Sequence, residues 1–235
     1  MKKKVAVISG ASKGIGKQLV IELSKIGYDI FFTYNTSKKE AILLRDNIRK
    51  KYNVNVYTQK CDNTNIDDIL NLKKSILEKY DHIDLLINNA SYSQDNYIDD
   101  KSKEEFMKVL EVNVVGTFLF TKYLYKYLDN GIIINISSTD SEDTYNRISM
   151  DYCASKAAIN SLTKTFAQEF DNIKVIGVMP NWTDTESVKE MNNEYLQNEL
   201  KRIGQDRLEN PNDVAKKILK TAFDKNVKSS EVVRV

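Results

Sequence analysis

Short apolar runs alternate with longer segments of helical periodicity along the whole chain. The short runs are rich in β-branched residues, which is typical of strands buried on both faces of a parallel sheet. They are Val5–Ser9, Ile30–Tyr34, Val54–Gln59, Ile83–Asn88, Ile132–Ser137, Lys174–Met179 and Val232–Val235. Between them, apolar residues recur at helical spacing in Ile15–Ile26, Lys38–Tyr52, Ile66–Tyr80, Lys103–Leu128, Ala154–Phe170 and Asp213–Phe223. The alternation predicts an α/β fold with one doubly wound parallel sheet of about seven strands flanked by helices.

No repeat, low-complexity tract or Pro/Gly-rich linker divides the chain, so residues 1–235 are expected to form a single domain. The least patterned stretch runs from Trp182 to Asn210. Connections of that length in a compact fold usually serve a function. We expect residues 182–210 to form a lid that covers the substrate.

Composition excludes several classes of function. Lys and Arg total 35 against 33 for Asp and Glu, so no strong field attracts the protein to nucleic acid or to an anionic membrane. Cys61 and Cys153 lie far apart, and His82 is the single histidine, so neither a disulfide framework nor a metal site is indicated. No apolar run approaches the length of a membrane helix, and we expect a cytoplasmic protein.

A glycine-rich turn follows the first predicted strand. It reads Ser9-Gly10-Ala11-Ser12-Lys13-Gly14-Ile15-Gly16 and opens a helical segment. Glycines in such a turn let the backbone approach a diphosphate, whose charge is met by the amino-terminal amides of the helix. The spacing is G-x-x-x-G-x-G, and the turn lacks the residues of a P-loop. Such a turn can also serve only to pack a helix against a strand.

A possible catalytic pair lies farther along the chain, in Tyr152-Cys153-Ala154-Ser155-Lys156. Residues four apart share a face of a helix, so the Lys156 ammonium can lie near the Tyr152 phenol and lower its pKa from about 10. Tyr152 could then donate a proton to a carbonyl or accept one from an alcohol. The preceding predicted strand ends in Ser137 and Ser138, at the edge where open α/β sheets bind ligands.

These motifs, in this order, resemble the classical short-chain dehydrogenases/reductases, and the pattern is closest to members similar to 3-oxoacyl-carrier-protein reductases. The resemblance implies a Rossmann-type fold and an enzyme that transfers a hydride between NADP and a small ketone or secondary alcohol. It implies catalytic roles for Asn113, Ser138, Tyr152 and Lys156. The cofactor-binding residues implied are Gly10, Ser12, Lys13, Gly14, Ile15, Gly16, Tyr34, Asn35, Thr36, Asp62, Asn63, Asn89, Ala90, Tyr152, Lys156, Pro180 and Thr185. Members of the family commonly pair through helices, so a homodimer or homotetramer built on Val109–Leu128 and Ala157–Phe170 is expected.

The chain departs from the family pattern at three places. Ser91 follows Asn88-Asn89-Ala90 where the family has glycine, and Asn181 follows Pro180 where the family has glycine. The usual spacing to Tyr152 selects Thr139 as the hydroxyl that orients the substrate, whereas the strand-end pattern selects Ser138. We favour Ser138, with one residue inserted in the polar loop 140–151.

The end of the second strand predicts a preference for NADPH. Folds of this kind that select NAD place an acid there to bond the ribose hydroxyls, and its charge repels a 2′-phosphate. Tyr34 takes that position, followed by Asn35 and Thr36, and Lys13 matches a family position whose basic side chain approaches the phosphate. Two other functions stay open: a non-catalytic NADP(H)-binding sensor or scaffold, and a reductase of a sugar or another small carbonyl compound.

Overall fold

Seven parallel strands form one sheet in the computed structural model, which describes residues 2–235. The strand order is β3-β2-β1-β4-β5-β6-β7, and the neighbouring strands run parallel in every pair, with Ile8 beside Phe32 and Ile87 beside Ile134. The strands are β1 (Val5–Ile8), β2 (Asp29–Tyr34), β3 (Val56–Lys60), β4 (Leu85–Asn88), β5 (Ile132–Ile136), β6 (Lys174–Met179) and β7 (Val232–Arg234). The predicted fold class is confirmed.

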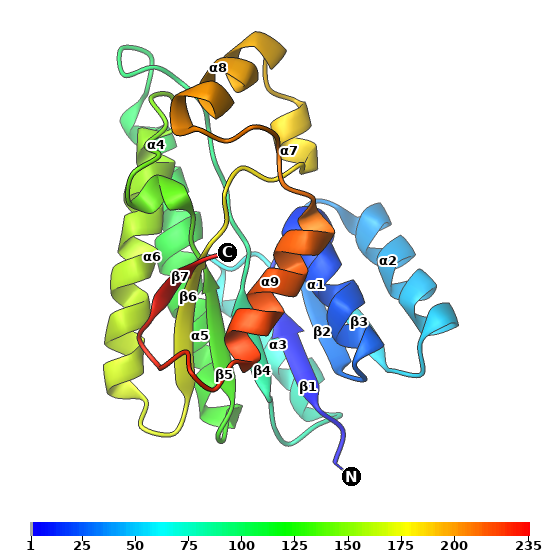
Figure 1. Cartoon of the computed structure of the whole chain (residues 1–235). Coiled ribbons are helices and arrows are strands. Elements are labelled where there is room, and N and C mark those ends of the chain that lie inside the picture. The colour runs from blue at the N-terminus through cyan, green and yellow to red at the C-terminus, as the bar shows by residue number, and fades with distance from the viewer. Residues whose placement is uncertain (1) are drawn as a thin grey trace.

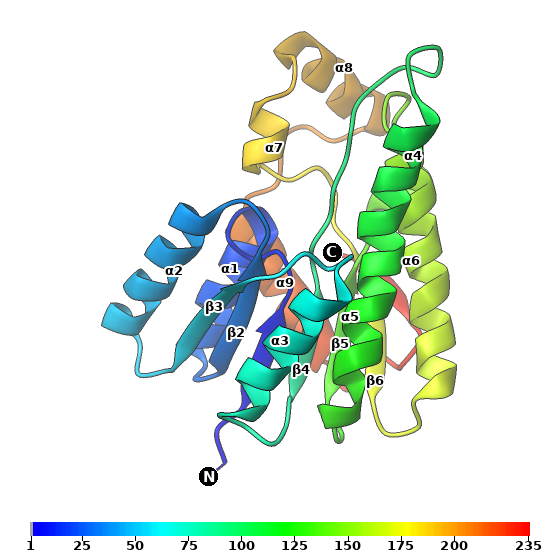
Figure 2. The same ribbon diagram turned by 180° about the vertical axis from the view of Figure 1, so that it is seen from behind.

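Helices cover both faces of this sheet (Figures 1 and 2). Side chains of α1 (Gly14–Lys25), α2 (Lys38–Lys51) and α9 (Pro211–Phe223) pack with Ala6 and Ile8 of β1 on one face. Side chains of α3 (Ile66–Leu77), α5 (Gly116–Leu124) and α6 (Met150–Glu169) pack with Val5 and Val7 on the other. Because both faces are buried, the strands contain continuous apolar runs instead of an alternation.

The long predicted helix Lys103–Leu128 is a succession of helical segments. They are α4 (Lys103–Leu110), a π-helical turn η1 (Glu111–Val115), α5, and a short 3-10 turn η2 (Tyr125–Tyr127). The dihedral angles at Leu110 and Val115 are helical, so the chain does not break between them. Single π-helical turns inside α-helices occur frequently at functional sites.

Residues 182–210, the least patterned stretch of the sequence, contain α7 (Glu186–Lys189) and α8 (Asn193–Ile203). The Asn192 side chain caps α8 by accepting from the Tyr195 amide, and Gly204 ends it in the left-handed conformation. Leu196 and Leu200 of α8 pack on Trp182 in a cluster separate from the two main cores. Capping residue, apolar spacing and terminal glycine were all visible in the sequence.

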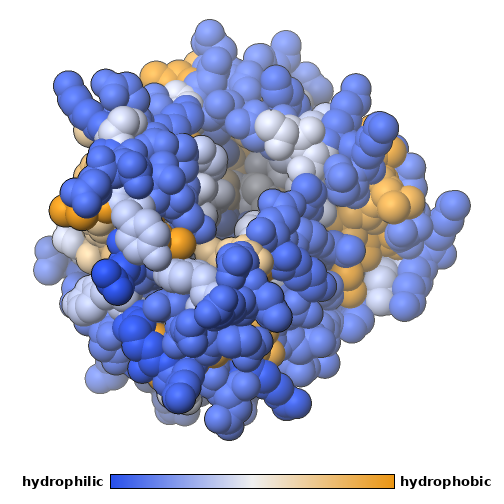
Figure 3. Space-filling view, turned by 90° about the horizontal axis from the view of Figure 1, so that it is seen from above, coloured by the Kyte–Doolittle hydropathy of each residue, from blue (hydrophilic) through white to orange (hydrophobic). Residues whose placement is uncertain are grey.

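Residues 182–210 stand above the carboxyl edge of the sheet (Figures 1 and 2). Their two ends are joined by a β-bridge between Thr183 and Glu209, and the Glu209 amide donates to the Trp182 carbonyl at 2.9 Å. Seen from above that edge, the molecular surface is hollowed near its centre (Figure 3). The strands before β1 in the sheet order and those after β4 are added in opposite directions across the sheet, so the order switches between β1 and β4, and ligands of open α/β sheets bind at such a point.

No helix within residues 2–235 is long and apolar enough to cross a membrane.

Candidate active site

The glycine turn joins β1 to α1 and leaves no room for side chains at its glycines. Gly10 has φ +60°, and a Cβ there would lie 2.7 Å from the Ala90 Cα. A Cβ on Gly16 would lie 2.5 Å from the Asn89 amide nitrogen. The Asn89 Nδ2 donates to the carbonyls of Ser9 and Gly10, at 3.0 and 2.9 Å, so the loop after β4 is fastened to the turn.

The amide of Gly14, at the start of α1, already faces an anion. Its N–H donates to the Glu186 carboxylate at 3.1 Å, and the Thr185 Cγ2 lies 3.2 Å from the position of a Cβ on Gly14. A helix amino terminus favours negative charge, and a dinucleotide diphosphate carries such charge. The turn therefore fits the diphosphate of a nicotinamide cofactor, with Thr185 at its side. Of the other turn residues, Ser12 is buried, Lys13 is exposed and Ile15 packs partly against the core.

The ends of β2 and β3 meet beside this turn. The Asn35 Nδ2 donates to the Asp62 carboxylate at 3.3 Å, and Thr36 is exposed. Burial alone would raise the pKa of Asp62, but hydrogen bonds from Thr64 and the charge of Lys108 bring it below its usual value. Tyr34 is buried in the core beneath the end of β2, and Asn63 is buried under α5. Asn35, Thr36 and Asp62 thus form an open polar edge, and Tyr34 and Asn63 support it from inside.

Tyr152 lies in the first turn of α6, two residues after the helix begins, with Lys156 one turn farther. The Lys156 ammonium lies 5.2 Å from the centre of the Tyr152 ring and donates to the Ile136 carbonyl at the end of β5, at 2.8 Å. Burial lowers the pKa of Lys156 to about 8, against the opposing effect of Asp140. The helix therefore brings the two side chains together, as the spacing predicts.

The expected lowering of the tyrosine pKa was wrong. Burial and the negative charge of Asp140 raise the pKa of the Tyr152 phenol well above its usual value, and hydrogen bonds with Ser138 and Ser91 offset this only in part. The physical reason is that the phenolate would lose its hydration, while the Lys156 ammonium is bonded to a backbone carbonyl. Tyr152 therefore keeps its proton at neutral pH.

Ser138 and Thr139, the two candidates for the substrate-orienting hydroxyl, differ in their surroundings. The Ser138 hydroxyl is a hydrogen-bond partner of the Tyr152 phenol and accepts from the Asp140 amide at 3.1 Å. The Thr139 Oγ1 lies 3.1 Å from the Thr144 Oγ1 and is buried, and the Thr139 amide donates to the carbonyl of Pro180. This geometry favours Ser138 as the hydroxyl beside the phenol.

The family model described as short chain dehydrogenase matches residues 4–196. The 3-oxoacyl-[acyl-carrier-protein] reductase FabG of Thermotoga maritima is 30% identical over 229 residues, which cover 95% of this chain and 92% of that protein. FabG of Staphylococcus aureus is 28% identical over 227 residues, which cover 94% of this chain and 92% of that protein.

The chain belongs to the short-chain dehydrogenase family. Members are oxidoreductases that bind a nicotinamide cofactor, act on small molecules and are typically oligomeric. The fold is shared with a dehydrogenase/reductase from Sinorhizobium meliloti, with a TM-score of 0.92, 24% identity, and coverage of 100% of this chain and 94% of that one. It is also shared with a Burkholderia cenocepacia short chain dehydrogenase solved in complex with NADP, with a TM-score of 0.91, 22% identity, and coverage of 99% and 96%.

In this short-chain dehydrogenase, Asn113 lies in the middle of the π-helical turn and is buried. Its Nδ2 donates to the Tyr92 carbonyl and to the Ser155 hydroxyl, both at 2.9 Å. Its Oδ1 accepts from the Tyr92 amide at 2.7 Å and from the Ser91 hydroxyl at 3.3 Å. The side chain therefore ties the loop after β4 to α6, and all four of its hydrogen-bonding positions are used.

Two polar groups beside Tyr152 were not predicted as site residues. The Ser91 hydroxyl, in place of the family's glycine, contacts both Asn113 and the phenol. Asp140, two residues after Ser138, is only 5% exposed. The sequence showed Ser91 as a departure from the family, but Asp140 stood in a polar loop that gave no sign of burial.

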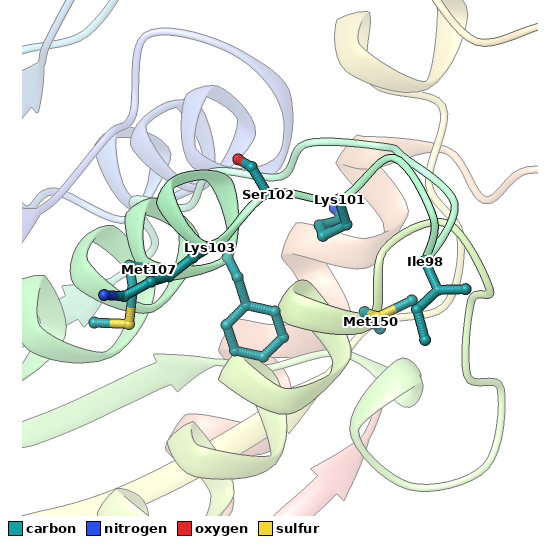
Figure 4. Close-up of a pocket in the computed structure, with 7 residues that line it drawn as sticks. Ile98, Lys101, Ser102, Lys103, Met107 and Met150 are labelled. Atoms are coloured by element: carbon teal, nitrogen blue, oxygen red, sulfur yellow. The ribbon is translucent and has the colours of Figure 1, made fainter.

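A cavity of about 250 Å³ lies at the start of α4, away from the glycine turn (Figure 4). It is lined by Ile98, Lys101, Ser102, Lys103, Phe106, Met107 and Met150. Met150 comes from the first turn of α6. The cavity therefore lies between the loop that leads from Asn89 to α4, the start of α4 and the start of α6. Residues 2–235 contain no cluster of His, Cys, Asp and Glu that could hold a metal ion.

Proposed function

We propose that this protein is an NADP(H)-dependent reductase of a ketone, with Tyr152 as the general acid. The observation that carries the proposal is the contact of the Tyr152 phenol with the Ser138 hydroxyl, with Lys156 one helical turn away. The relatives named 3-oxoacyl-[acyl-carrier-protein] reductase favour a 3-oxoacyl thioester as the substrate class.

In the proposed reaction the Ser138 hydroxyl donates a hydrogen bond to the substrate oxygen and orients it toward the phenol. Tyr152 then transfers its proton to that oxygen as negative charge develops there. Lys156 stabilises the resulting phenolate, and Asn113 holds the loop and helix that place these groups. A bound nicotinamide would supply the hydride. The same groups act in reverse when a secondary alcohol is oxidised.

NADPH is the proposed cofactor. No acidic side chain stands at the end of β2, where Tyr34 is buried and Asn35 and Thr36 present neutral polar groups. The exposed Lys13 lies directly before α1, in the glycine turn. Both features favour a 2′-phosphate over a free hydroxyl, because the phosphate gains a cation and meets no carboxylate at the strand end.

Residues 182–210 are proposed as the cover of the substrate site in a single-domain protein of residues 1–235. The bridge between Thr183 and Glu209 gives the segment a narrow base, and α8 carries its own apolar cluster with Trp182. Movement of this segment as a unit would leave the main cores intact, and it would break the contacts of Glu186 with Gly14 and of Arg202 with Thr144. A homo-oligomer, paired through α5 and α6, is proposed as the assembly.

The proposed function is tested with a panel of ketones, 3-oxoacyl thioesters and sugars, monitored by the loss of NADPH absorbance. We expect at least one ketone or thioester to be reduced. Tyr152→Phe should lower kcat by about 10²–10⁴, since it removes the transferable proton, while the Kd for NADPH should change little.

Tyr145→Phe is the matched control, since Tyr145 is an exposed tyrosine in the loop before α6 and should keep full activity. Wild-type turnover by Tyr152→Phe, measured where chemistry limits the rate, would exclude the assigned role. Binding of NADPH without reduction of any compound in the panel would favour the non-catalytic sensor.

A further inference from the structure

We propose that Asp140 is an electrostatic positioning residue, whose buried carboxylate keeps both Lys156 and Tyr152 protonated and so sets the alkaline limit of carbonyl reduction. The inference rests on the proposed function and adds to it a residue that the family motifs do not include. Asp140 lies in the 3-10 turn η3 (Thr139–Ser141), directly after Ser138.

Burial raises the pKa of the Asp140 carboxyl, and hydrogen bonds with Thr144, Trp182 and Ser138 oppose that rise by favouring the carboxylate. The Thr144 hydroxyl donates to its Oδ1 at 2.6 Å, a length typical of a hydroxyl bonded to a charged carboxylate. The Trp182 side chain is a second hydrogen-bond donor. A carboxylate that is 5% exposed is costly to bury, and these two donors replace the water it loses.

The charge of Asp140 acts on the buried ammonium of Lys156, the proposed catalytic cation. Lys156 is 3% exposed, and its ammonium donates to a neutral acceptor, the Ile136 carbonyl. Both side chains lie at the carboxyl end of β5, one in η3 and one on α6, and the contacts between η3 and α6 are extensive. The direct hydrogen bonds of the Asp140 side chain are made to Thr144, Trp182 and Ser138, so its charge acts on Lys156 through space.

The other charged and titratable groups around Asp140 come from two helices. On α6 they are Tyr152, Cys153 and Lys156, and on α8 it is Arg202. The Arg202 guanidinium is occupied elsewhere, since it pairs with Glu199 at 2.7 Å and donates to the Thr144 carbonyl at 2.6 Å. Asp140 therefore acts chiefly on the groups of α6.

The direction of the effect is the same for both catalytic groups. A nearby negative charge raises the pKa of a lysine, by stabilising the ammonium, and of a tyrosine, by opposing the phenolate. Asp140 thus raises the pKa of Lys156, which burial lowers to about 8, and raises that of Tyr152. Reduction requires a proton on each group, so loss of the carboxylate should move the alkaline limb of the rate profile to lower pH.

The test compares the pH dependence of ketone reduction in the wild-type protein and in Asp140→Asn. In Asp140→Asn we expect the alkaline limb of the rate profile to move to lower pH by about one unit. This is the order of magnitude for the effect of one charge on a neighbouring group in a partly buried site. Asp140→Ser, a smaller neutral replacement, should move it in the same direction. Asp140→Glu, which restores the charge, should bring it back toward the wild-type position even if kcat is lower.

If Asp140 served only as a structural link between η3 and Trp182, its replacement would lower kcat or raise KM without moving the alkaline limb of the rate profile. Asp143→Asn is the control, because Asp143 is an exposed acid in the same loop, paired with Arg234. It should leave the profile unchanged. A limb that stays in place in both Asp140→Asn and Asp140→Ser would overturn the inference.

A second measurement needs no substrate. In protein labelled with 13C-lysine, the Lys156 signal is assigned with Lys156→Arg and titrated by nuclear magnetic resonance. Its midpoint should lie near pH 8 in the wild type and lower in Asp140→Asn. An equal midpoint in the two proteins would overturn the role of Asp140, whereas a wild type that reduces no ketone would remove only the proposed reaction.

Discussion

The proposed preference for NADPH depends on single residues at the end of β2 and in the glycine turn. Lys13→Ala removes the cation proposed to meet the 2′-phosphate. A hydrogen bond to a charged group contributes about 1.5–3 kcal/mol, so the ratio of kcat/KM for NADPH over NADH should fall by about tenfold or more. Adding Tyr34→Asp places a carboxylate at the strand end and should move the preference further toward NADH.

Lys50→Ala is the control for this comparison, because Lys50 is an exposed lysine at the far end of α2. Tyr34 is 8% exposed, so thermal unfolding of the double variant must show that it still folds. Equal kcat/KM for both cofactors in the unmodified protein, at physiological salt, would contradict the proposed preference.

At the residue scale, the sequence predicted groups that belong to local motifs and missed those that depend on distant packing. Tyr152 and Lys156 share a helix, so their spacing alone brings them together. Asp140 is buried because Thr144 folds back on it and Trp182 reaches it from the segment after β6. A polar loop is normally read as solvated, and nothing local distinguishes a carboxylate that a distant side chain will cover.

At the scale of elements, the loop after β4 is joined to α6 by a buried ion pair. The Lys101 ammonium lies 2.9 Å from the Asp151 carboxylate, and the two side chains are 3% and 0% exposed. Asp151 also accepts from the Tyr152 amide at 2.9 Å, next to the catalytic side chain. The pair therefore fixes the start of the catalytic helix against the loop that lines the cavity of Figure 4.

Lys101→Met should lower the free energy of unfolding by about 3–5 kcal/mol, because it leaves the Asp151 carboxylate buried without its cationic partner. Replacing both residues, as in Lys101→Met with Asp151→Leu, should cost less than Lys101→Met alone. Urea unfolding followed by circular dichroism measures both values.

Lys108→Met provides the matched control on α4. Lys108 pairs with Glu111 at 3.2 Å, and both side chains are about half exposed. Exposed pairs contribute about 0–1 kcal/mol, so this variant should unfold nearly as the wild type does. Similar losses for Lys101→Met and Lys108→Met would show that the buried pair does not stabilise the start of α6.

The elements themselves were largely predictable, with shifts of one to a few residues at their ends. The strands lie where apolar runs predicted them, because a sheet buried on both faces selects such runs. The π-helical turn around Asn113 could not be predicted, since its apolar spacing is that of an ordinary helix. The turn is distinguished by its backbone, in which the Gly116 amide donates to the Glu111 carbonyl five residues earlier, and the buried Asn113 side chain bonds Tyr92 and Ser155 from it.

For the whole molecule, the surface of α4 to α5 indicates how subunits would pair. Met107, Val115 and Phe118 are 52%, 46% and 41% exposed, and their spacing places them along one side of the helical stretch. Ala154 and Ala157 of the neighbouring α6 are exposed and small, which allows a second helix to approach closely. An isologous interface needs such a self-complementary surface.

We therefore expect light scattering at micromolar concentration to give a multiple of the 27.0 kDa chain mass. Combining Val115→Glu with Phe118→Glu should shift the protein toward monomer, because association would bury two unpaired carboxylates from each subunit. Leu43→Glu, at an apolar position of α2 that is 63% exposed, should leave the mass unchanged. A monomeric wild type would remove the proposed assembly, and dissociation by Leu43→Glu would place the interface on α2 instead of on α5 and α6.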